Sequence, residues 1–593
     1  MCGINGFNFK DEILLKKMSA TTHSRGPDNE GFYFNENFSV SHNRLAIIDI
    51  DKRSNQPFKF ENFIISFNGE IYNYLVLKKK LINLGYIFST TSDTEVIIKL
   101  FHKFGEDSFK MLSGIFAFSI FDERKKIFYL IRDAIGVKPL YFVFDSFSKK
   151  FYFSSLIKSL LKCNISKELN TLAVNSYANF NRNDLRETFF KNIFKVLPGE
   201  MIKVSGSNFE RKKVIELSPD QKVSTKNIKN EIQEIFSDQL ISDVPVALSL
   251  SGGIDSNLLL SVMLKKLDNN FTSYSVNFKD SNKYNRDHQI AKEISKKHGI
   301  RFNSIETSFN DFKDRAEEIV DIVEEPTGNT NSIANLILSE NVNEKVLFSG
   351  DGGDEIFTGY HRYRSICILS KILKFNFLKK FKLNLKSRFL KRLFINNSRK
   401  LYLSFSEQNL FKSQNRIYKN FKLFDDDDLN EVLNHSKNTT KSSLSSVMFH
   451  DLDTWIVNDI LLRNDKIYSN KGIEVRVPFL DKNLVTKYLM ASDFQKFGFK
   501  FENKHLLNKN FKNELKDTLK KKYGFNSPFA GWLRKELFEF AKFVLSKDYY
   551  NSSSIIDLNL CQKLIDTHQK NYFDPYLIWN LISLQIFLRK YRF

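Results

Sequence analysis

The fold of the larger part of this chain is decided by one stretch, which reads Val244-Pro245-Val246-Ala247-Leu248-Ser249-Leu250-Ser251-Gly252-Gly253-Ile254-Asp255-Ser256. It begins as an apolar strand, turns at the two glycines and continues into the helical pattern of residues 257–267. Backbone N–H groups in such a turn, together with the N-terminus of the helix that follows, form a cradle for phosphate. The turn lacks the Gly-Lys-Ser/Thr ending of kinase-type phosphate loops, which argues against simple transfer of a γ-phosphate.

Strands and helices alternate after this stretch. Thr272–Phe278 and Lys345–Ser349 have the composition of buried strands, and Arg286–His298 has a helical pattern between them. This alternation predicts a doubly wound parallel sheet with helices on its faces. Nearly every segment beyond residue 360 has a helical pattern. We therefore predict a C-terminal domain at residues 225–593, in which a doubly wound α/β part is followed by a helical part.

The first third of the chain has a different pattern, in which short β-type runs are broken by turn residues. This change of pattern agrees with the length of the chain: 593 residues are too many for a single hydrophobic core, because such cores stop growing near roughly 250–300 residues, so more than one domain is expected. The step Asn68-Gly69 after one of the runs is typical of a tight turn. We predict stacked antiparallel sheets with a few helices over residues 1–205. The runs that support this are Phe63–Phe67, Gly114–Phe121, Ile127–Ile131 and Phe151–Phe153.

Composition and charge exclude several classes of protein. With 42% hydrophobic and 27% charged residues, the chain has the composition of a soluble globular protein. Its formal charge of +22 is spread along the sequence without a nucleic-acid-binding signature, so we expect no nucleic acid partner. There is neither a run of ~18 apolar residues nor a signal-peptide pattern, which predicts a cytoplasmic protein with no transmembrane segment. The four cysteines show no metal-ligand spacing, and we expect reduced thiols.

Two local runs of charge differ from the rest of the sequence. Residues 371–400 hold eleven Lys or Arg and no acid, mixed with apolar residues at helix-like intervals. Such a segment can rest on an anionic membrane or a partner, or it can form a helix pair whose apolar face is core. We favour the helix pair. The acidic run Asp425–Asp428 is typical of a solvated turn or the start of a helix.

Cysteine at position 2 has the most specific chemistry in the first domain. Removal of Met1 would leave a thiol and a free α-amine on the same residue. An amine with an unperturbed pKa of ~7.7–8.0 can take the proton of its own thiol, and only the thiolate attacks a carbonyl carbon. The position therefore favours Cys2 as a catalytic nucleophile.

The residues around Cys2 resemble, in order and spacing, the amidotransferases that carry an N-terminal nucleophile. The resemblance covers the whole first third of the chain. It implies a four-layer sandwich of two antiparallel sheets between helices, which releases ammonia from glutamine. The matching motifs are Cys2-Gly3-Ile4, Ser24-Arg25-Gly26-Pro27-Asp28, His42-Asn43-Arg44-Leu45-Ala46-Ile47-Ile48-Asp49, Gln56-Pro57, Asn68-Gly69-Glu70-Ile71-Tyr72-Asn73, Ser92-Asp93-Thr94-Glu95 and Gly136-Val137-Lys138-Pro139-Leu140-Tyr141.

The resemblance implies a role in glutamine binding or catalysis for the matching residues. Arg44 would bind the α-carboxylate of glutamine, a role that suits a planar guanidinium. Glu70 and Asp93 would bind its α-ammonium, and Asn68 with Gly69 would form the oxyanion hole from an amide and a backbone N–H. The alternatives are a hairpin turn at Asn68-Gly69, a surface cation at Arg44 and a helix cap at Asp93. Their joint spacing behind the cysteine favours the functional interpretation.

A second cluster follows the strand Lys345–Ser349 and lands at the same sheet edge as the glycine-rich turn, where open α/β folds bind ligands. It resembles the second signature of the asparagine synthetase family. The glycine-rich turn itself resembles the pyrophosphatase loop of enzymes that split ATP into AMP and pyrophosphate, so ATP is the expected cosubstrate. The matching residues are Ser349-Gly350-Asp351-Gly352-Gly353-Asp354-Glu355-Ile356-Phe357-Thr358-Gly359-Tyr360, then Gly472-Ile473-Glu474-Val475-Arg476-Val477-Pro478-Phe479-Leu480-Asp481, Lys504, Lys522-Tyr523-Gly524-Phe525, Pro528 and Trp532.

The same resemblance implies a nucleotide site and a metal site. Asp255 and Asp354 offer hard oxygen donors beside a triphosphate, so Mg²⁺ is the expected metal. Asp351 would lie near an acyl-adenylate, and Lys504 would neutralise charge on the departing pyrophosphate. The alternative is an acidic loop that only caps a helix. The residues expected at ATP are Leu250, Ser251, Gly252, Gly253, Asp255, Ser256, Val276, Ser349 and Gly350.

The implied reaction converts glutamine, aspartate and ATP into glutamate, asparagine, AMP and pyrophosphate. Cys2 would release ammonia, which would cross the interior and attack a β-aspartyl adenylate at the second site. Asp351 stands where asparagine synthetases often carry glutamate, Leu156 and Asn508 replace charged residues, and Glu325-Pro326-Thr327-Gly328-Asn329-Thr330-Asn331 lacks an aspartate that many relatives have. These departures leave the acceptor open. The closest alternative is the same machinery acting on another carboxylate, such as a uronic-acid sugar of a surface polysaccharide.

Two further alternatives are disfavoured by the residues present. A lactam-forming synthetase would lack the nucleophile that Cys2 provides, and a nitrogen-sensing binding protein would require both sites to be degenerate. The oligomeric state stays open, with a homodimer as one expectation.

Overall fold

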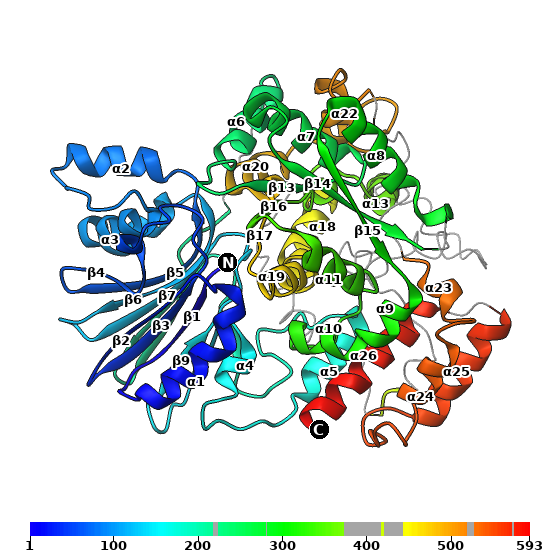
Figure 1. The fold of residues 1–593 in the computed structure, drawn as a ribbon, viewed down its shortest axis with the longest axis horizontal. Coiled ribbons are helices and arrows are strands. Elements are labelled where there is room, and N and C mark those ends of the chain that lie inside the picture. Colours follow the sequence, from blue (N-terminus) through cyan, green and yellow to red (C-terminus); the bar gives the residue numbers. More distant parts are fainter. Residues whose placement is uncertain are drawn as a thin grey trace.

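The computed structural model describes residues 1–217, 223–279, 282–372, 417–419, 443–516, 518, 527–571 and 574–593. Figure 1 shows a sandwich of strands from the first third of the chain beside a body of helices around a parallel sheet. The segments Asp425–Asp428 and Lys522-Tyr523-Gly524-Phe525 lie outside the described residues, as does all of the basic run 371–400 after residue 372.

Two antiparallel sheets form the core of the first third. Within residues 1–217, one sheet has the strand order β10-β8-β9-β1-β3-β2 and the other the order β12-β11-β7-β6-β5-β4. Neighbouring strands in both sheets run antiparallel. The first sheet contains β1 (Gly3–Phe7), β2 (Asn29–Asn35), β3 (Phe38–Arg44), β8 (Tyr141–Phe144), β9 (Phe151–Ser154) and β10 (Phe194–Lys195); the second contains β4 (Phe58–Phe60), β5 (Phe63–Ile71), β6 (Gly114–Asp122), β7 (Ile127–Arg132), β11 (Glu200–Ser205) and β12 (Asn208–Lys213).

Helices cover the outer faces of the two stacked sheets. On one side α1 (Glu12–Thr22) and α4 (Ile157–Leu160) pack against the first sheet, and on the other α3 (Asp93–Phe104), with α2 (Tyr74–Asn83) behind it, packs against the second. Between the sheets, Phe38 of β3 meets Phe121 of β6 with ring centroids 3.8 Å apart. Burial of one such ring stabilises the fold by about 1.5–3 kcal/mol. The predicted four-layer sandwich is therefore confirmed.

The Asn68-Gly69 step is where the predicted local structure was wrong. These residues form no turn, because β5 runs through them and pairs Asn68 with Ala117 and Gly69 with Phe116 on β6. The glycine is required by close packing: its φ is +146°, and a Cβ would lie 2.0 Å from the carbonyl oxygen of Ile115. The second sheet also continues through β12, so a boundary at residue 205 would divide the hairpin of β11 and β12.

The second body is built on a parallel sheet with the order β15-β14-β13-β16-β17. The chain runs outward from β13 to β14 and β15, then returns to the other side of β13 for β16. Loops that follow β13 and β16 therefore meet at the point where the strand order reverses, which is where such folds bind ligands. The strands are β13 (Val246–Ser249), β14 (Thr272–Phe278), β15 (Arg301–Thr307), β16 (Val346–Phe348) and β17 (Glu474–Arg476), and the helices around them are α6 (Ile228–Asp238), α7 (Ile254–Leu267), α8 (Arg286–His298), α9 (Phe309–Asp314), α10 (Ala316–Val323) and α11 (Asn331–Asn341).

The described residues beyond 360 are mainly helical, as predicted, with β17 as an exception. The C-terminal helix α26 (Pro575–Tyr591) packs against α10, and its Asn580 carbonyl accepts a hydrogen bond from Tyr177 of α5 (Thr171–Phe180) at 3.2 Å. Among the described helices, none is long and apolar enough to cross a membrane. The other described helices from residue 353 onward are α12 (Gly353–Ile356), α13 (His361–Ile372), α18 (Ser443–Asp451), the π-helix η7 (Leu452–Leu461), α19 (Leu462–Ser469), the 3-10 helix η8 (Pro478–Leu480), α20 (Lys482–Tyr488), α21 (Asp493–Phe497), α22 (His505–Asn510), α23 (Phe529–Trp532), α24 (Phe538–Val544) and α25 (Leu558–Asn571).

Candidate active sites

The thiol of Cys2 lies immediately before β1, and the pairing of that strand fixes its position. Cys2 is 9% exposed, and its backbone N–H donates to Oδ1 of Asn68 at 2.9 Å. The backbone N–H of Leu45 points at its sulfur, with an N···S distance of 3.5 Å. Burial raises the pKa of the thiol, and the neighbouring N-terminal amine lowers it. The thiol therefore needs a nearby base to become a nucleophile.

The N-terminal amine is held in the same buried position. Burial lowers the pKa of the Met1 amine to about 5, so at neutral pH it is an unprotonated base. Met1 itself is 2% exposed. After removal of Met1, the free amine would be the Cys2 nitrogen that already bonds to Asn68.

Asn68 provides a buried hydrogen-bond donor beside the thiol. Its side chain is fully buried on β5, and its Nδ2 has no hydrogen-bond partner within the described part of the chain. A buried donor left unsatisfied costs about 1–3 kcal/mol, so such a group is retained where a ligand completes it. With the backbone N–H of Gly69, this amide can stabilise negative charge that develops on a carbonyl oxygen.

Arg44 stands at the end of β3 and is 5% exposed, so it is not the surface cation of the alternative interpretation. Its guanidinium donates to the carbonyls of Asp51 (2.9 Å) and Ile48 (3.3 Å), to that of Asp49, and to Oδ1 of Asn55 (2.9 Å). All of these acceptors are neutral. The positive charge is therefore positioned by its own loop without being neutralised by it, which suits a carboxylate ligand.

Two buried carboxyl groups, Glu70 and Asp93, lie at the end of β5 and the start of α3. Ser92 caps α3, while the Asp93 carboxylate accepts from the N–H of Ile71 at 3.0 Å, so the helix-cap alternative does not hold. Burial raises the pKa of Asp93 to about 6. Burial also raises the pKa of Glu70, although Arg476 lies 3.3 Å away. Two adjacent carboxyl groups in a buried position suit an ammonium ligand.

A cavity of about 1090 Å³ opens where the loops after β13 and β16 meet. The predicted ATP residues line it, except Gly252. Gly252 has a φ of +69°, and a Cβ at this position would lie 2.8 Å from Cγ2 of Ile290. Leu250 and Val276 form its apolar side, while Ser251 and Ser256 bond to each other at 3.1 Å. The other predicted residues that line it are Gly253, Asp255, Ser349, Gly350, Asp351, Asp354 and Lys504.

Asp255 and Asp354 face each other across the ammonium of Lys504, which pairs with both. The second oxygen of Asp255 is buried and accepts no hydrogen bond within the described residues. Lys504 has a φ of +54°, a region that non-glycine residues occupy at a cost and often at functional sites. The buried Asp255 oxygen beside the phosphate cradle, with the Asp354 carboxylate across from it, fits Mg²⁺, which commonly takes one or two carboxylates together with substrate phosphates.

Comparison with known proteins finds one family model for each part of the chain. Residues 1–214 match the family model for the glutamine amidotransferase domain, and residues 227–589 match the model for asparagine synthase. The chain belongs to the asparagine synthase family. The combination of the two models identifies a glutamine-dependent amidating enzyme.

Two relatives match nearly the whole length of this asparagine synthase family member, and a third matches part of it. It is 28% identical to asparagine synthetase (glutamine-hydrolyzing) 1 of Bacillus subtilis over 99% of this chain and 97% of that protein. It is 26% identical to asparagine synthetase (glutamine-hydrolyzing) 3 of the same organism over 100% and 99%. A putative asparagine synthetase (glutamine-hydrolyzing) 2 of Methanocaldococcus jannaschii is 34% identical over 61% of this chain and 76% of the relative.

In this family member, helix α19 touches both sites through consecutive residues. Arg25 donates to the Cys2 carbonyl at 3.0 Å and pairs with Asp465 of α19 at 2.8 Å, with both side chains almost fully buried. The preceding residue, Asn464, donates to the Asp351 carboxylate at 2.8 Å. A single helix therefore fixes the relative positions of the nucleophile and the second site.

Sequence reasoning missed part of the cavity wall. Trp455 and Arg463 line it, and each donates to the Asp459 carboxylate, at 3.1 and 3.2 Å. Trp455 and Asp459 lie on the π-helix η7, a rare conformation that often occurs at functional sites. The ring of Tyr360, which ends the second signature, is 5.3 Å from that of Trp455. No residue spacing marks a π-helix in sequence, so its side chains could not be assigned to the cavity.

Proposed function

We propose that this chain is an asparagine synthetase, which transfers ammonia from glutamine to the β-carboxylate of aspartate at the expense of ATP. The observation that supports this most is helix α19, which joins a buried thiol with an oxyanion-type donor to a phosphate-type cavity. A fixed geometry between the two sites lets ammonia released at one react at the other before it is lost to solvent. One chain that carries both provides it.

The first half-reaction uses the residues around Cys2. The α-amine of the processed chain takes the thiol proton, and the thiolate attacks the side-chain amide carbon of glutamine. The oxyanion receives hydrogen bonds from Nδ2 of Asn68 and the N–H of Gly69. The ammonium of Cys2 then gives its proton to the leaving nitrogen, so that ammonia departs and a γ-glutamyl thioester remains. Water hydrolyses this thioester to glutamate.

Substrate recognition in this half-reaction is electrostatic. Arg44 binds the α-carboxylate of glutamine through a guanidinium whose present acceptors are all neutral. Glu70 and Asp93 bind the α-ammonium. Placement of both charged ends holds the amide carbon at the thiol, which lowers the barrier by orientation.

The second half-reaction takes place in the cavity between β13 and β16. Leu250 and Val276 contact the adenine, the turn from Ser251 to Ser256 cradles the phosphates, and Ser349 with Gly350 contacts the AMP part. A β-carboxylate oxygen of aspartate attacks the α-phosphorus, and pyrophosphate leaves. Ammonia then attacks the acyl carbon of β-aspartyl-AMP near Asp351, the C–O bond to AMP breaks, and the added nitrogen loses a proton to solvent, which leaves asparagine.

Lys504 neutralises charge on the departing pyrophosphate, and Mg²⁺ is the metal ion expected beside it. Asp255 and Asp354 would hold this ion, which when bound offsets the negative charge of the triphosphate. Lys504 already lies between these carboxylates. The phosphates of ATP would draw the Lys504 ammonium away from the two carboxylates, because the triphosphate as a whole carries more negative charge than they do.

The test is an assay of the purified protein with ATP, glutamine and a panel of carboxylates, in which pyrophosphate and the amide product are measured. Aspartate is expected to stimulate pyrophosphate release, with asparagine as product. Asp255→Asn serves as the background control. If aspartate does neither and another carboxylate does, the assignment of the acceptor is wrong.

One observation favours a second acceptor, a uronic-acid sugar. The cavity is large, and the rings of Tyr360 and Trp455 form part of its wall. Flat aromatic faces of this kind pack against the apolar face of a sugar ring. In the same assay, a uronic-acid sugar that stimulates pyrophosphate release when aspartate does not would support this alternative.

A further inference from the structure

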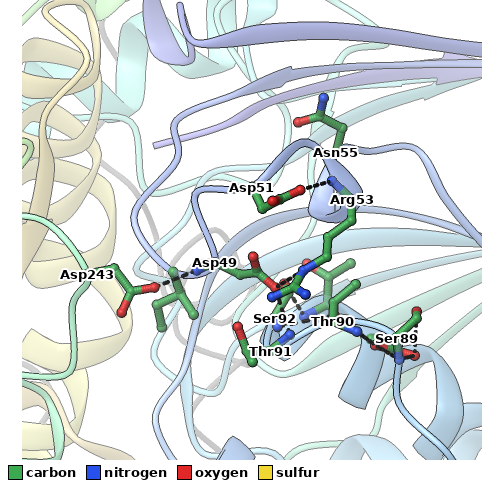
Figure 2. Close-up of polar contacts among 12 residues, drawn as sticks. Asp49, Asp51, Arg53, Asn55, Ser89, Thr90, Thr91, Ser92 and Asp243 are labelled. Atoms are coloured by element: carbon green, nitrogen blue, oxygen red, sulfur yellow. Dashed lines mark hydrogen bonds and ion pairs between the residues drawn. The ribbon is translucent and has the colours of Figure 1, made fainter.

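Asp243 makes a two-point contact between the C-terminal part of the chain and the loop that carries the glutamine site. It lies between α6 and β13. Its backbone N–H donates to the Ile47 carbonyl at 3.0 Å, and its Oδ2 accepts from the backbone N–H of Asp49 at 2.8 Å. Figure 2 shows the carboxylate of Asp243 at the backbone of Asp49, on the side away from Arg53 and Thr91. The backbone on both sides of Ile48 is thereby fixed.

Asp49 is the point at which several elements meet. Its φ of +48° lies in the left-handed region, which a non-glycine residue adopts at a cost, so the conformation needs support from neighbours. Its buried carboxylate accepts from the N–H of Thr91 at 2.6 Å and pairs with Arg53 at 3.3 Å (Figure 2). Thr91 is two residues before Asp93. The backbone of Asp49 therefore depends on Asp243, and its side chain reaches the segment of the ammonium-binding carboxylate.

The same loop holds the guanidinium of Arg44. Its carbonyl acceptors are Ile48, Asp49 and Asp51. Asp243 contacts the backbone of Ile47 and Asp49, so both residues bond to Asp49, and Asp243 also holds the residue next to Ile48. A shift of the backbone at Asp49 would move an acceptor of Arg44 by the same amount. Arg44 would then lose its position relative to the thiol.

We propose that Asp243 is a positioning residue for glutamine binding, which acts from the C-terminal part of the chain through the backbone of residues 47–49 on Arg44. This inference rests on the proposed role of Arg44 at the glutamine carboxylate. Asp243 also lies three residues before β13, the strand that leads into the phosphate cradle. The glutamine site is thus completed only when both parts of the chain are in place.

The test measures glutamine hydrolysis against glutamine concentration for the parent, Asp243→Ala and Asp243→Asn. Asp243→Ala removes one hydrogen bond to a charged acceptor, and its KM for glutamine should rise about tenfold, which corresponds to ~1.4 kcal/mol. Its kcat should stay within about twofold, because the thiol and the oxyanion donors are untouched. Asp243→Asn keeps an oxygen that can accept from Asp49, and its KM should return to within about threefold of the parent.

Controls separate this role from a general effect on folding. Asp238→Ala changes an exposed carboxylate at the end of α6, a few residues away, and should leave KM unchanged. Synthesis with ammonium chloride should be the same in all variants. If Asp243→Ala changes KM by less than twofold, if Asp243→Asn is as impaired as Asp243→Ala, or if ammonium-dependent synthesis falls in parallel, the inference is overturned.

Arg44→Ala distinguishes failure of the inference from failure of the function on which it rests. A normal KM in Arg44→Ala would refute the proposed glutamine site itself, and the role of Asp243 with it. A raised KM in Arg44→Ala together with a normal KM in Asp243→Ala would refute only the positioning role.

Discussion

Asn68→Ala tests whether the buried amide stabilises a transition state. In the structure the Asn68 side chain is fully buried, its Oδ1 accepts from the Cys2 nitrogen at 2.9 Å, and its Nδ2 is available to a ligand. Removal of one oxyanion donor commonly lowers kcat by about 10²–10³, or about 2.7–4 kcal/mol. A donor that bonds mainly to the oxyanion affects the ground state little, so KM for glutamine should change by less than about threefold.

The assay follows glutamate formation against glutamine concentration, with ammonium-dependent synthesis as the check on folding. Asn62→Ala is a matched control, because Asn62 precedes the same strand and bonds to Asp122 at 2.7 Å, away from the thiol. Its glutamine hydrolysis should be normal. A raised KM with normal kcat in Asn68→Ala would show that the amide binds substrate and not the oxyanion, and the mechanism given for Cys2 would have to change.

Three other predictions concern the metal, the thiol and a carboxyl group. Asp255→Asn and Asp354→Asn should each abolish pyrophosphate release but keep glutamine hydrolysis, because an amide cannot replace carboxylate charge beside magnesium; synthetase turnover in either variant would refute the metal site. Cys2→Ala should lose glutamine-dependent synthesis and retain synthesis from ammonium chloride, rising with pH as free ammonia increases; glutamine-dependent product would eliminate Cys2 as nucleophile. Burial raises the pKa of Asp93 to about 6, so its carboxylate is lost as pH falls through that value; KM for glutamine should rise below pH 6, and a profile in Asp93→Asn identical to the parent would refute this assignment.

Local sequence patterns predicted the elements whose residues are continuous and strongly periodic. Strand Thr272–Phe278 and helix Arg286–His298 have the predicted bounds, because each forms from its own residues and buries one pattern of side chains. β17 (Glu474–Arg476) could not be predicted in this way. It is short, and its strand conformation depends on pairing with β16, more than a hundred residues earlier.

The candidate sites also divide into features that local sequence predicts and features that depend on residues far apart in the sequence. Motifs pointed to the thiol, the amide and the phosphate cradle one by one, because each motif is a run of residues close in sequence. Gly69 was assigned to a turn, since the Asn-Gly step favours one locally, and only the approach of Ile115 explains the glycine. Contacts such as that between Asp243 and Asp49 join residues that are 194 positions apart, and no local pattern contains this information.

Buried ion pairs between the first third and the rest of the chain indicate what their interface does. Arg25 pairs with Asp465 at 2.8 Å, Lys138 with Glu474 at 3.5 Å and Glu70 with Arg476 at 3.3 Å, and each side chain is at most 6% exposed. Desolvation of such pairs largely offsets their attraction, so they add little net stability, whereas loss of one partner is costly. Apolar residues of similar volume would hold the two parts together at least as well, but apolar contacts are not directional and would allow the two parts to shift slightly. A buried ion pair requires its two charged groups to stay in one relative position. We infer that these pairs serve to fix the position of the glutamine site relative to the cavity, which the proposed transfer of ammonia between them requires.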